Sequence, residues 1–200
     1  MKLYTIDTGY FKLDGGAMFG VVPKSLWNKP NPSDENNLCN WAMRCLLIED
    51  GDRLILIDNG IGDKQDERFF SHYKLNGSDT LLKSLAKYGF SPEDVTDNIV
   101  THLHFDHCGG GIKWNAERTG YEAVFPNAIY WVSKPQWELA LHPNAREKAS
   151  FLKENILPMQ ELGQLKLVEQ EGDLLPNISV RFVNGHTDGM MIPYIFNDGS

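Results

Sequence analysis

The segment from residue 101 to residue 111 constrains this chain more than any other part of its sequence. It reads Thr-His-Leu-His-Phe-Asp-His-Cys-Gly-Gly-Gly, and it contains His102, His104, Asp106 and His107. In an extended chain, residues two apart face the same way, so His102 and His104 present two imidazoles to one point. Burying these side chains without an ion would leave polar atoms unpaired, at about 1–3 kcal/mol for each group. We therefore expect a metal ion here, and Asp106 and His107, just beyond, can serve a second ion.

The rest of the chain predicts strands and helices in alternation. Runs rich in β-branched and aromatic residues predict strands at 3–7, 17–22, 41–49, 53–58, 99–104, 128–132, 165–168 and 178–183. Asp50-Gly51 predicts a hairpin turn between two of them. Apolar periodicity predicts helices at 80–88, 135–141 and 145–156, the first of them capped by Asp79. The fold class that we predict is α+β, with stacked sheets at the centre and helices outside, in a single domain over residues 1–200.

The charge and the cysteine content indicate which binding partners and which cellular compartment to expect. Lys and Arg number 19 against 27 Asp and Glu, a formal net charge of −8, which disfavours nucleic acid and anionic membranes as partners. The longest aliphatic runs, such as 54–57, are too short to cross a bilayer. Cys39, Cys45 and Cys108 form an odd set without a Cys-x-x-Cys pair, which favours reduced, packed thiols and a cytoplasmic location. We expect a small-molecule substrate and leave a homodimer open.

Three stretches of the sequence together resemble one family of hydrolases. The histidine motif with its glycine-rich turn, the sequence Gly185-His186-Thr187, and Leu56-Ile57-Asp58-Asn59-Gly60 resemble the metallo-β-lactamase-fold superfamily over nearly the whole chain. The resemblance implies a four-layer αββα sandwich. It also implies that one ion is held by His102, His104 and His186 and a second by Asp106 and His107. Asp58 would then support one of the ligands through a hydrogen bond.

The sequence departs from the family pattern in two places. Asp188 stands where the family usually has proline after Gly-His-Thr. The family also supplies a bridging aspartate and a last histidine from later strands, whereas here Asp198 is the only carboxylate near the end, in an Asn-Asp-Gly sequence that predicts a hairpin turn. We therefore expect a C-terminally incomplete copy of the domain, which lacks some strands and has an under-ligated second metal site.

The donor set predicts hydrolytic metal chemistry. Imidazole and carboxylate ligands suit Zn²⁺ best, with two ions expected in a full-length domain, and Mn²⁺, Fe or Co can use the same donors. A bound ion lowers the pKa of its water from about 15.7 to about 7, which generates hydroxide at neutral pH for attack on a carbonyl or phosphoryl group. Asp106 is the predicted catalytic residue, which orients this water or returns a proton to the leaving group.

The substrate class is predicted from the N-terminal stretch. Residues 13–24 and Trp27 resemble the opening segment of the lactonase-like branch, which includes acyl-homoserine lactonases and organophosphate hydrolases. Met18, Phe19 and Trp27 would then wall a pocket for an acyl or aryl group, and a core role for them is equally open. A small lactone or ester is the first choice. The alternatives are a phosphodiesterase or nuclease, a glyoxalase II-like thioesterase, and a metal-binding module without catalysis.

Overall fold

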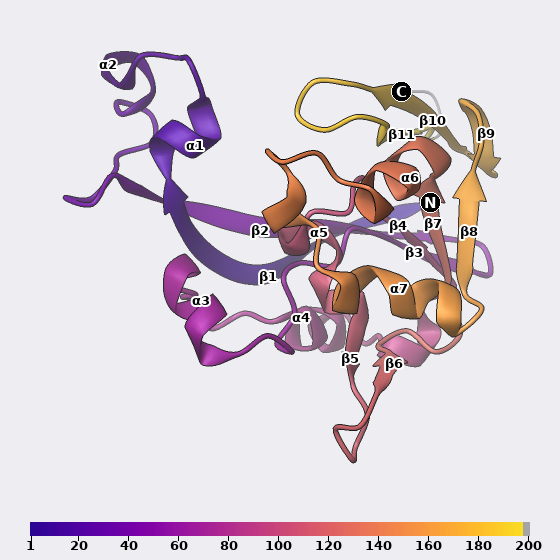
Figure 1. Cartoon of the computed structure of the whole chain (residues 1–200). Helices are drawn as coiled ribbons and strands as arrows, with labels where there is room; N and C mark the ends of the chain where they lie inside the picture. The colour runs from indigo at the N-terminus through magenta and orange to yellow at the C-terminus, as the bar shows by residue number, and fades with distance from the viewer. Residues whose placement is uncertain (198–200) are drawn as a thin grey trace.

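The computed structural model describes residues 1–197, and its central feature is a six-stranded sheet (Figure 1). In spatial order the strands are β1 (Lys2–Asp14), β2 (Leu38–Asp50), β3 (Arg53–Ile57), β4 (Asp97–Ile99), β7 (Ile129–Ser133) and β8 (Leu165–Val168). The first three pair antiparallel and the last three join as parallel neighbours. The predicted hairpin turn joins β2 to β3: Asp50 pairs with Arg53, so Gly51 and Asp52 form the turn, and Gly51 has a positive φ of 59°.

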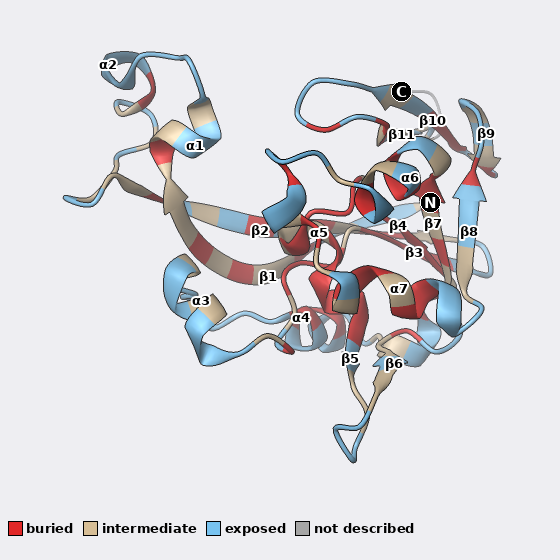
Figure 2. Ribbon diagram, in the orientation of Figure 1, coloured by how far each residue is buried: buried red, intermediate tan, exposed pale blue. Residues whose placement is uncertain are grey.

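Helices and short turns connect the parallel strands. They are α3 (Glu67–Tyr73), α4 (Leu81–Lys87), η1 (Pro92–Asp94), α5 (Phe105–Cys108), η2 (Gly109–Gly111), α6 (Lys134–Leu141), η3 (Lys148–Ser150) and α7 (Lys153–Glu161). A small hairpin of β5 (Ile112–Trp114) and β6 (Tyr121–Ala123) follows the glycine turn. Apolar residues of α4, α6 and α7, such as Leu85, Trp137 and Met159, pack with the sheet in one core cluster. Buried residues accordingly gather along the central strands and around α5 (Figure 2).

A second sheet covers the other side of the first. It contains β9 (Gly172–Leu175), β10 (Ile178–Val183) and β11 (Met190–Ile195), all antiparallel. Ile178, Val180 and Met191 pack against Ile55 and Ile99 of the first sheet in a separate core cluster. The predicted α+β class is confirmed, and the layers seen in residues 1–197 are helix, sheet and sheet. On the outer side of β11, Ile192, Tyr194 and Phe196 are exposed, and Asp198 lies outside the described residues.

Three local predictions differ from the structure. The strand expected at 17–22 is replaced by α1 (Gly15–Phe19) and the start of an excursion that continues into α2 (Lys24–Trp27). Thr80 caps α4 in place of Asp79, because the Thr80 hydroxyl accepts from the Lys83 amide at 3.3 Å. The helix expected at 145–156 begins only at Lys153, after the turn η3, and runs to Glu161.

The three cysteines agree with the expectation of reduced, packed thiols. Cys39, Cys45 and Cys108 are all buried and unbridged, which fits their predicted role as packing residues. Among residues 1–197, no helix is long and apolar enough to cross a membrane.

Close backbone packing fixes the glycine turn that follows the histidine motif. The loop after β3 and the loop after α5 pair through the Asn59 amide, which donates to the His107 carbonyl at 2.9 Å, and the Gly110 amide, which donates to the Gly60 carbonyl at 3.0 Å. A Cβ atom on Gly110 would lie closer than 3.0 Å to the Asn59 carbonyl oxygen. Glycine at this position therefore lets two backbones meet, and the contact holds the motif against the end of β3.

We expect Gly110→Ala to destabilise the fold by about 1–3 kcal/mol or more, because the added methyl group must push two hydrogen-bonded backbones apart. Urea unfolding measures the change. Gly120→Ala is the matched control: it lies in the β5–β6 connection, and the nearest atom to its Cβ is the Asn115 Nδ2 at 3.5 Å. The control should stay within about 0.5 kcal/mol of the parent. Equal midpoints for the two variants would contradict the close-packing account.

Candidate metal centre

The site forms at the edge where the parallel strands β3 and β4 end. Asp58 follows β3 directly, and its amide donates to the Ile99 carbonyl at the end of β4 at 2.9 Å. After β4 the chain continues as an irregular loop through His102 to His104. The strand predicted at 99–104 therefore ends at Ile99, earlier than expected. His104 is the extended residue that precedes α5, which carries Asp106 and His107. The sheet edge thus gathers the first two histidines, the carboxylate of Asp58 and the start of α5.

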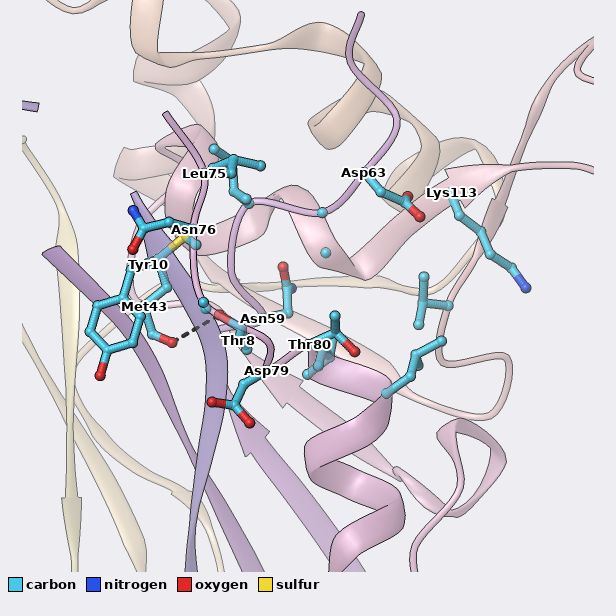
Figure 3. A pocket seen from close by; sticks show the side chains of 18 residues that line it. Thr8, Tyr10, Met43, Asn59, Asp63, Leu75, Asn76, Asp79, Thr80 and Lys113 are labelled. Atoms are coloured by element: carbon cyan, nitrogen blue, oxygen red, sulfur yellow. Dashed lines mark hydrogen bonds between the residues drawn. The ribbon is translucent and has the colours of Figure 1, made fainter. Parts of the chain in front are cut away.

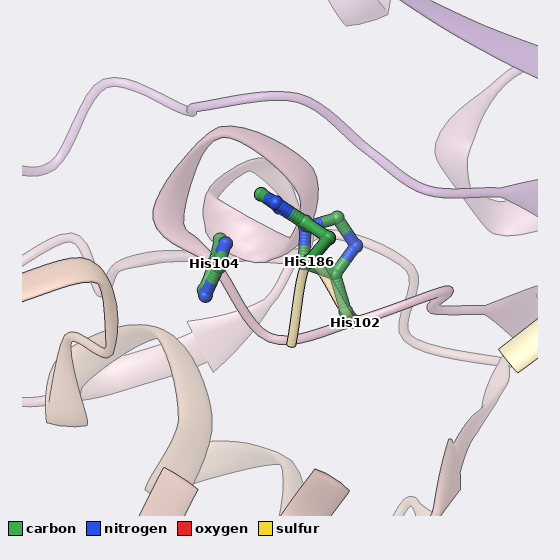
Figure 4. A group of neighbouring side chains, drawn as sticks. All are labelled: His102, His104 and His186. Atoms are coloured by element: carbon green, nitrogen blue, oxygen red, sulfur yellow. The ribbon is translucent and has the colours of Figure 1, made fainter. Parts of the chain in front are cut away.

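Three imidazoles meet at this edge (Figure 4). His102, His104 and His186 each offer a ring nitrogen, and these atoms all lie within 4.8 Å of one another. His102 and His104 are buried, and the Nε2 atom of each has no hydrogen-bond partner. His186 comes from the exposed loop between β10 and β11. Two buried, unpaired nitrogens that converge with a third imidazole fit a metal ion, since coordination satisfies atoms that would otherwise stay unpaired.

Burial keeps the two inner histidines neutral. Burial, and then the neighbouring His186, lower the pKa of His104 to about 4. Burial, followed by His107 and the other two rings, also lowers the pKa of His102 well below its ordinary value. Neutral imidazole is the form that binds metal, so both rings are ready to act as ligands at neutral pH without losing a proton first.

His107 and Asp106 lie beside the histidine group, and Asp58 fixes the His107 ring. The rings of His102 and His107 have centroids 4.0 Å apart. Asp58 Oδ2 is hydrogen-bonded to His107 Nδ1 at 2.8 Å. The other ring nitrogen, His107 Nε2, lies 3.4 Å from Asp106 Oδ2. Burial lowers the pKa of His107, but the hydrogen bond and charge of Asp58 and the charge of Asp106 outweigh it and raise the pKa to about 9. Asp58 thus orients the His107 ring. The role of Asp58 as a support for a metal ligand, and the assignment of two ions, stay predictions.

Comparison with known proteins agrees with this geometry. Residues 44–189 match the family model of the metallo-beta-lactamase superfamily. The chain belongs to the metallo-β-lactamase superfamily. A probable metal-dependent hydrolase of known structure from Staphylococcus aureus is 32% identical, with a TM-score of 0.89 over 99% of this chain and 69% of its own.

Curated and structural relatives within this metallo-β-lactamase superfamily include lactonases. The N-acyl homoserine lactonase AiiA of Bacillus thuringiensis subsp. kurstaki is 26% identical over 209 residues, which cover all of this chain and 72% of the relative. The structure of AidC, a dizinc quorum-quenching lactonase in complex with a product, is 25% identical with a TM-score of 0.74, over 98% of this chain and 68% of that one. Membership of the superfamily makes this protein a hydrolase by family.

The candidate metal centre also contains a carboxylate that no motif in the sequence marks. Glu147, buried in the loop after α6, places its Oε2 atom 3.8 Å from His104 Nε2 and accepts a hydrogen bond from the Thr187 hydroxyl at 2.7 Å. Burial raises its pKa, but hydrogen bonds from Thr187 and Asn144 and the nearby His104 leave the pKa below its usual value. Glu147 lies within the helix predicted at 145–156, where an acidic residue is typical of the solvent-exposed face.

The predicted pocket residues lie elsewhere in the fold. Phe19 stacks on Trp27 with ring centroids 5.0 Å apart and also packs on Trp41 at 5.5 Å. Trp27 is buried, and Met18 is exposed. The helices α1 and α2 that carry them project from the far end of β1 and β2, away from α5 (Figure 1). The packing of Phe19 and Trp27 fits the core role that the sequence left open, whereas the exposure of Met18 does not. A contact of Met18, Phe19 or Trp27 with substrate stays a prediction.

A different set of aromatic residues borders the site. We call Phe69, Tyr73 and Phe105 the aromatic cluster: the Phe105 ring lies 5.3 Å from Phe69 and 4.7 Å from Tyr73, measured between centroids. Phe105 stands between His104 and Asp106 in the motif. Burial, and then the charge of Asp106, raise the pKa of Tyr73. The sequence-based prediction missed Phe69 and Tyr73 because no pattern in α3 connects them to the histidine motif, which lies much later in the chain.

A cavity of about 440 Å³ lies on the other side of the glycine turn (Figure 3). Its lining includes Met43, Leu81, Asn59 and Gly110, with Asp63 and Lys113 among its charged residues. It contains none of the three grouped histidines, so it is separate from the candidate metal centre.

The buried Lys64 gives the glycine turn a pH-dependent contact. Its Nζ atom donates to the Gly109 carbonyl, and burial lowers the pKa of Lys64 to about 8, against the raising effects of Cys108, Asp63 and Glu154. Between pH 8 and 10.5, Lys64 is mostly protonated in the unfolded protein and mostly neutral in the folded protein. Unfolding then takes up a proton, so the contribution of Lys64 to stability rises with pH across this window.

We expect the difference in unfolding free energy between the parent and Lys64→Met to grow in favour of the parent from pH 8 to pH 10.5, by up to about 3 kcal/mol. Urea denaturation of the metal-free proteins at several pH values measures it. Lys113→Met, which removes an exposed lysine, should give a profile that follows the parent. If all three profiles run in parallel, Lys64 does not titrate as described.

Proposed function

We propose that this protein is a metal-dependent hydrolase of small lactones or esters, with Zn²⁺ as the preferred ion. The observation that carries the proposal is the convergence of His102, His104 and His186 with two buried, unpaired Nε2 atoms. The similarity to lactonases over the whole chain supports the substrate class. A bound ion would polarise the carbonyl oxygen of the substrate and lower the pKa of a water molecule.

Each protein side chain of the site has a role in this proposal. His102, His104 and His186 would hold one ion, and His107 and Asp106 would serve a second. Asp106, half-buried beside His107, would orient a water molecule or return a proton to the alcohol that leaves when the ester bond breaks. Asp58 holds the His107 ring and also accepts from the Thr101 amide at 2.8 Å, so it fixes the loop that leads to His102.

The aromatic cluster supports a substrate with an apolar part. Phe69 and Tyr73 are only partly buried, while Phe105 is buried beneath them and lies next to Asp106 in the chain. Their rings supply apolar surface around Phe105, the residue before Asp106, and apolar surface is what an acyl chain or aryl group needs in order to leave water. A net charge of −8 favours a neutral or cationic substrate over a polyanion.

We expect His104→Ala to lose both metal uptake and hydrolysis, because it removes one of two buried ligands. Metal content by elemental analysis and turnover of a lactone panel measure the two effects. His142→Ala is the matched control, since His142 is an exposed histidine at the end of α6. It should keep the metal content and activity of the parent. Full activity in His104→Ala would refute the assignment.

We expect removal of metal by a chelator to abolish hydrolysis, and Zn²⁺ or Mn²⁺ to restore it. The protein is assayed before chelation, after chelation and after each metal is returned, against lactones, aryl esters, thioesters and phosphodiesters side by side. Lactones or esters should be cleaved fastest. Preference for phosphodiesters or thioesters would replace the proposed substrate class, and metal binding without turnover of any substrate would favour a binding module.

A further inference from the structure

One glutamine side chain joins the two loops that carry the three grouped histidines. Gln136, in α6, is completely buried. Its Oε1 atom accepts a hydrogen bond from the Leu103 amide at 3.2 Å. Its Nε2 atom donates to the Thr187 hydroxyl at 3.1 Å and to the Asp188 carbonyl at 2.5 Å. Leu103 lies between His102 and His104, and Thr187 follows His186 directly, so a single amide group is bonded to both ligand loops.

The hydroxyl of Thr187 leads from this amide to Glu147. It donates to Glu147 Oε2 at 2.7 Å, so its proton is used there and its lone pair is left to accept from Gln136. Asn144 holds Glu147 in turn, through its side-chain amide at 3.2 Å and through its Oδ1 atom, which accepts from the Glu147 backbone amide at 3.0 Å. The same carboxylate lies 3.8 Å from His104 Nε2, so the chain of contacts returns to the histidine group.

Within the loop that carries His186, the Asn184 side chain accepts a hydrogen bond from the Gly189 amide at 2.8 Å, so other contacts must tie the loop to the rest of the protein. Gly185 and Gly189 flank it with φ values of 151° and 72°. His186 itself is exposed, whereas Thr187 is buried. The contacts that tie the loop to the body of the protein come from the start of α6 and the segment after it: Ser133 donates to the Gly189 carbonyl, and Arg146 donates to the His186 carbonyl at 3.0 Å.

We infer that Gln136 is a positioning residue for the metal: it sets the distance between His186 and the His102–His104 pair and so completes the ion site before the ion arrives. This inference rests on the metal site of the proposed function. The amide suits the task because it offers an acceptor to one loop and donors to the other at the same time. A loop held in place loses less conformational freedom when its histidine binds an ion, so the ion binds more tightly.

Zinc affinity of the folded, metal-free chain tests the inference without reference to hydrolysis. We expect Gln136→Leu to raise the dissociation constant for Zn²⁺ by about 10- to 100-fold, measured by competition with a chromophoric chelator. The visible absorption of bound Co²⁺ should change as well, because the ligand geometry loosens. Gln164→Leu is the matched control: the Gln164 amide also bonds backbone carbonyls, those of Phe125 and Ala128 at 2.9 Å, away from the histidines. It should bind zinc within about threefold of the parent.

A pair of variants at Thr187 covers the case in which Gln136→Leu does not fold. Thr187→Val removes the hydroxyl that bonds Gln136 and Glu147, and it should weaken zinc binding about 10-fold or more, whereas Thr187→Ser keeps the hydroxyl and should restore the affinity. Circular dichroism confirms that each metal-free variant is folded.

The outcomes separate the two proposals. Folded Gln136→Leu and Thr187→Val that bind zinc as the parent does, even with lower melting temperatures, would reduce Gln136 to a structural role and overturn the inference. If the parent chain binds no zinc, the proposed metal site itself fails.

Discussion

The candidate metal centre depends on a cluster of imidazoles in which two buried ring nitrogens have no hydrogen-bond partner. His102 and His104 are buried with free Nε2 atoms, and they meet His186, which comes from a segment more than 80 residues away in the sequence. By itself, this grouping of neutral rings adds little to the stability of the fold, because each unpaired polar atom in a buried position costs about 1–3 kcal/mol. A metal ion turns the same arrangement into a set of satisfied ligands. The parallel ends of β3 and β4, the glycine turn and the loop from β10 to β11 all serve to keep that arrangement in place.

The sequence predicted the parts of the site that are local. His102, His104, Asp106 and His107 lie in one short stretch, and their spacing alone indicates a ligand set. The hairpin at Asp50-Gly51 and the helix near residues 80–88 were predicted correctly for the same reason, because the turn residues and the apolar period lie within a few positions of each other. Asp58 and His186 required the resemblance to the family, since nothing in their immediate surroundings marks them.

The parts that the sequence did not predict depend on contacts between distant segments. Gln136 and Glu147 lie 51 and 40 positions from Thr187, and neither belongs to a motif. The segment at 17–22 has a strand-like composition, yet the Asp14 side chain accepts from the Ala17 amide and begins a helical turn there. In the same way the Thr80 hydroxyl caps α4 one residue later than expected. Tertiary packing and local side-chain hydrogen bonds decided these cases, and composition did not.

The family usually has proline where this chain has Asp188. The atoms that hold the His186 loop explain why the loop accepts this difference. Gln136 bonds the carbonyl oxygen of Asp188, and any residue, proline included, carries that oxygen at the same place in the backbone. The Asp188 side chain is exposed and adds charge only at the surface of the loop. Thr187, by contrast, uses its hydroxyl both as a donor and as an acceptor in a buried position, so valine, although it has the same shape, would lose both hydrogen bonds. The loop therefore tolerates change at residue 188 and depends on residue 187, although both stand next to the same histidine.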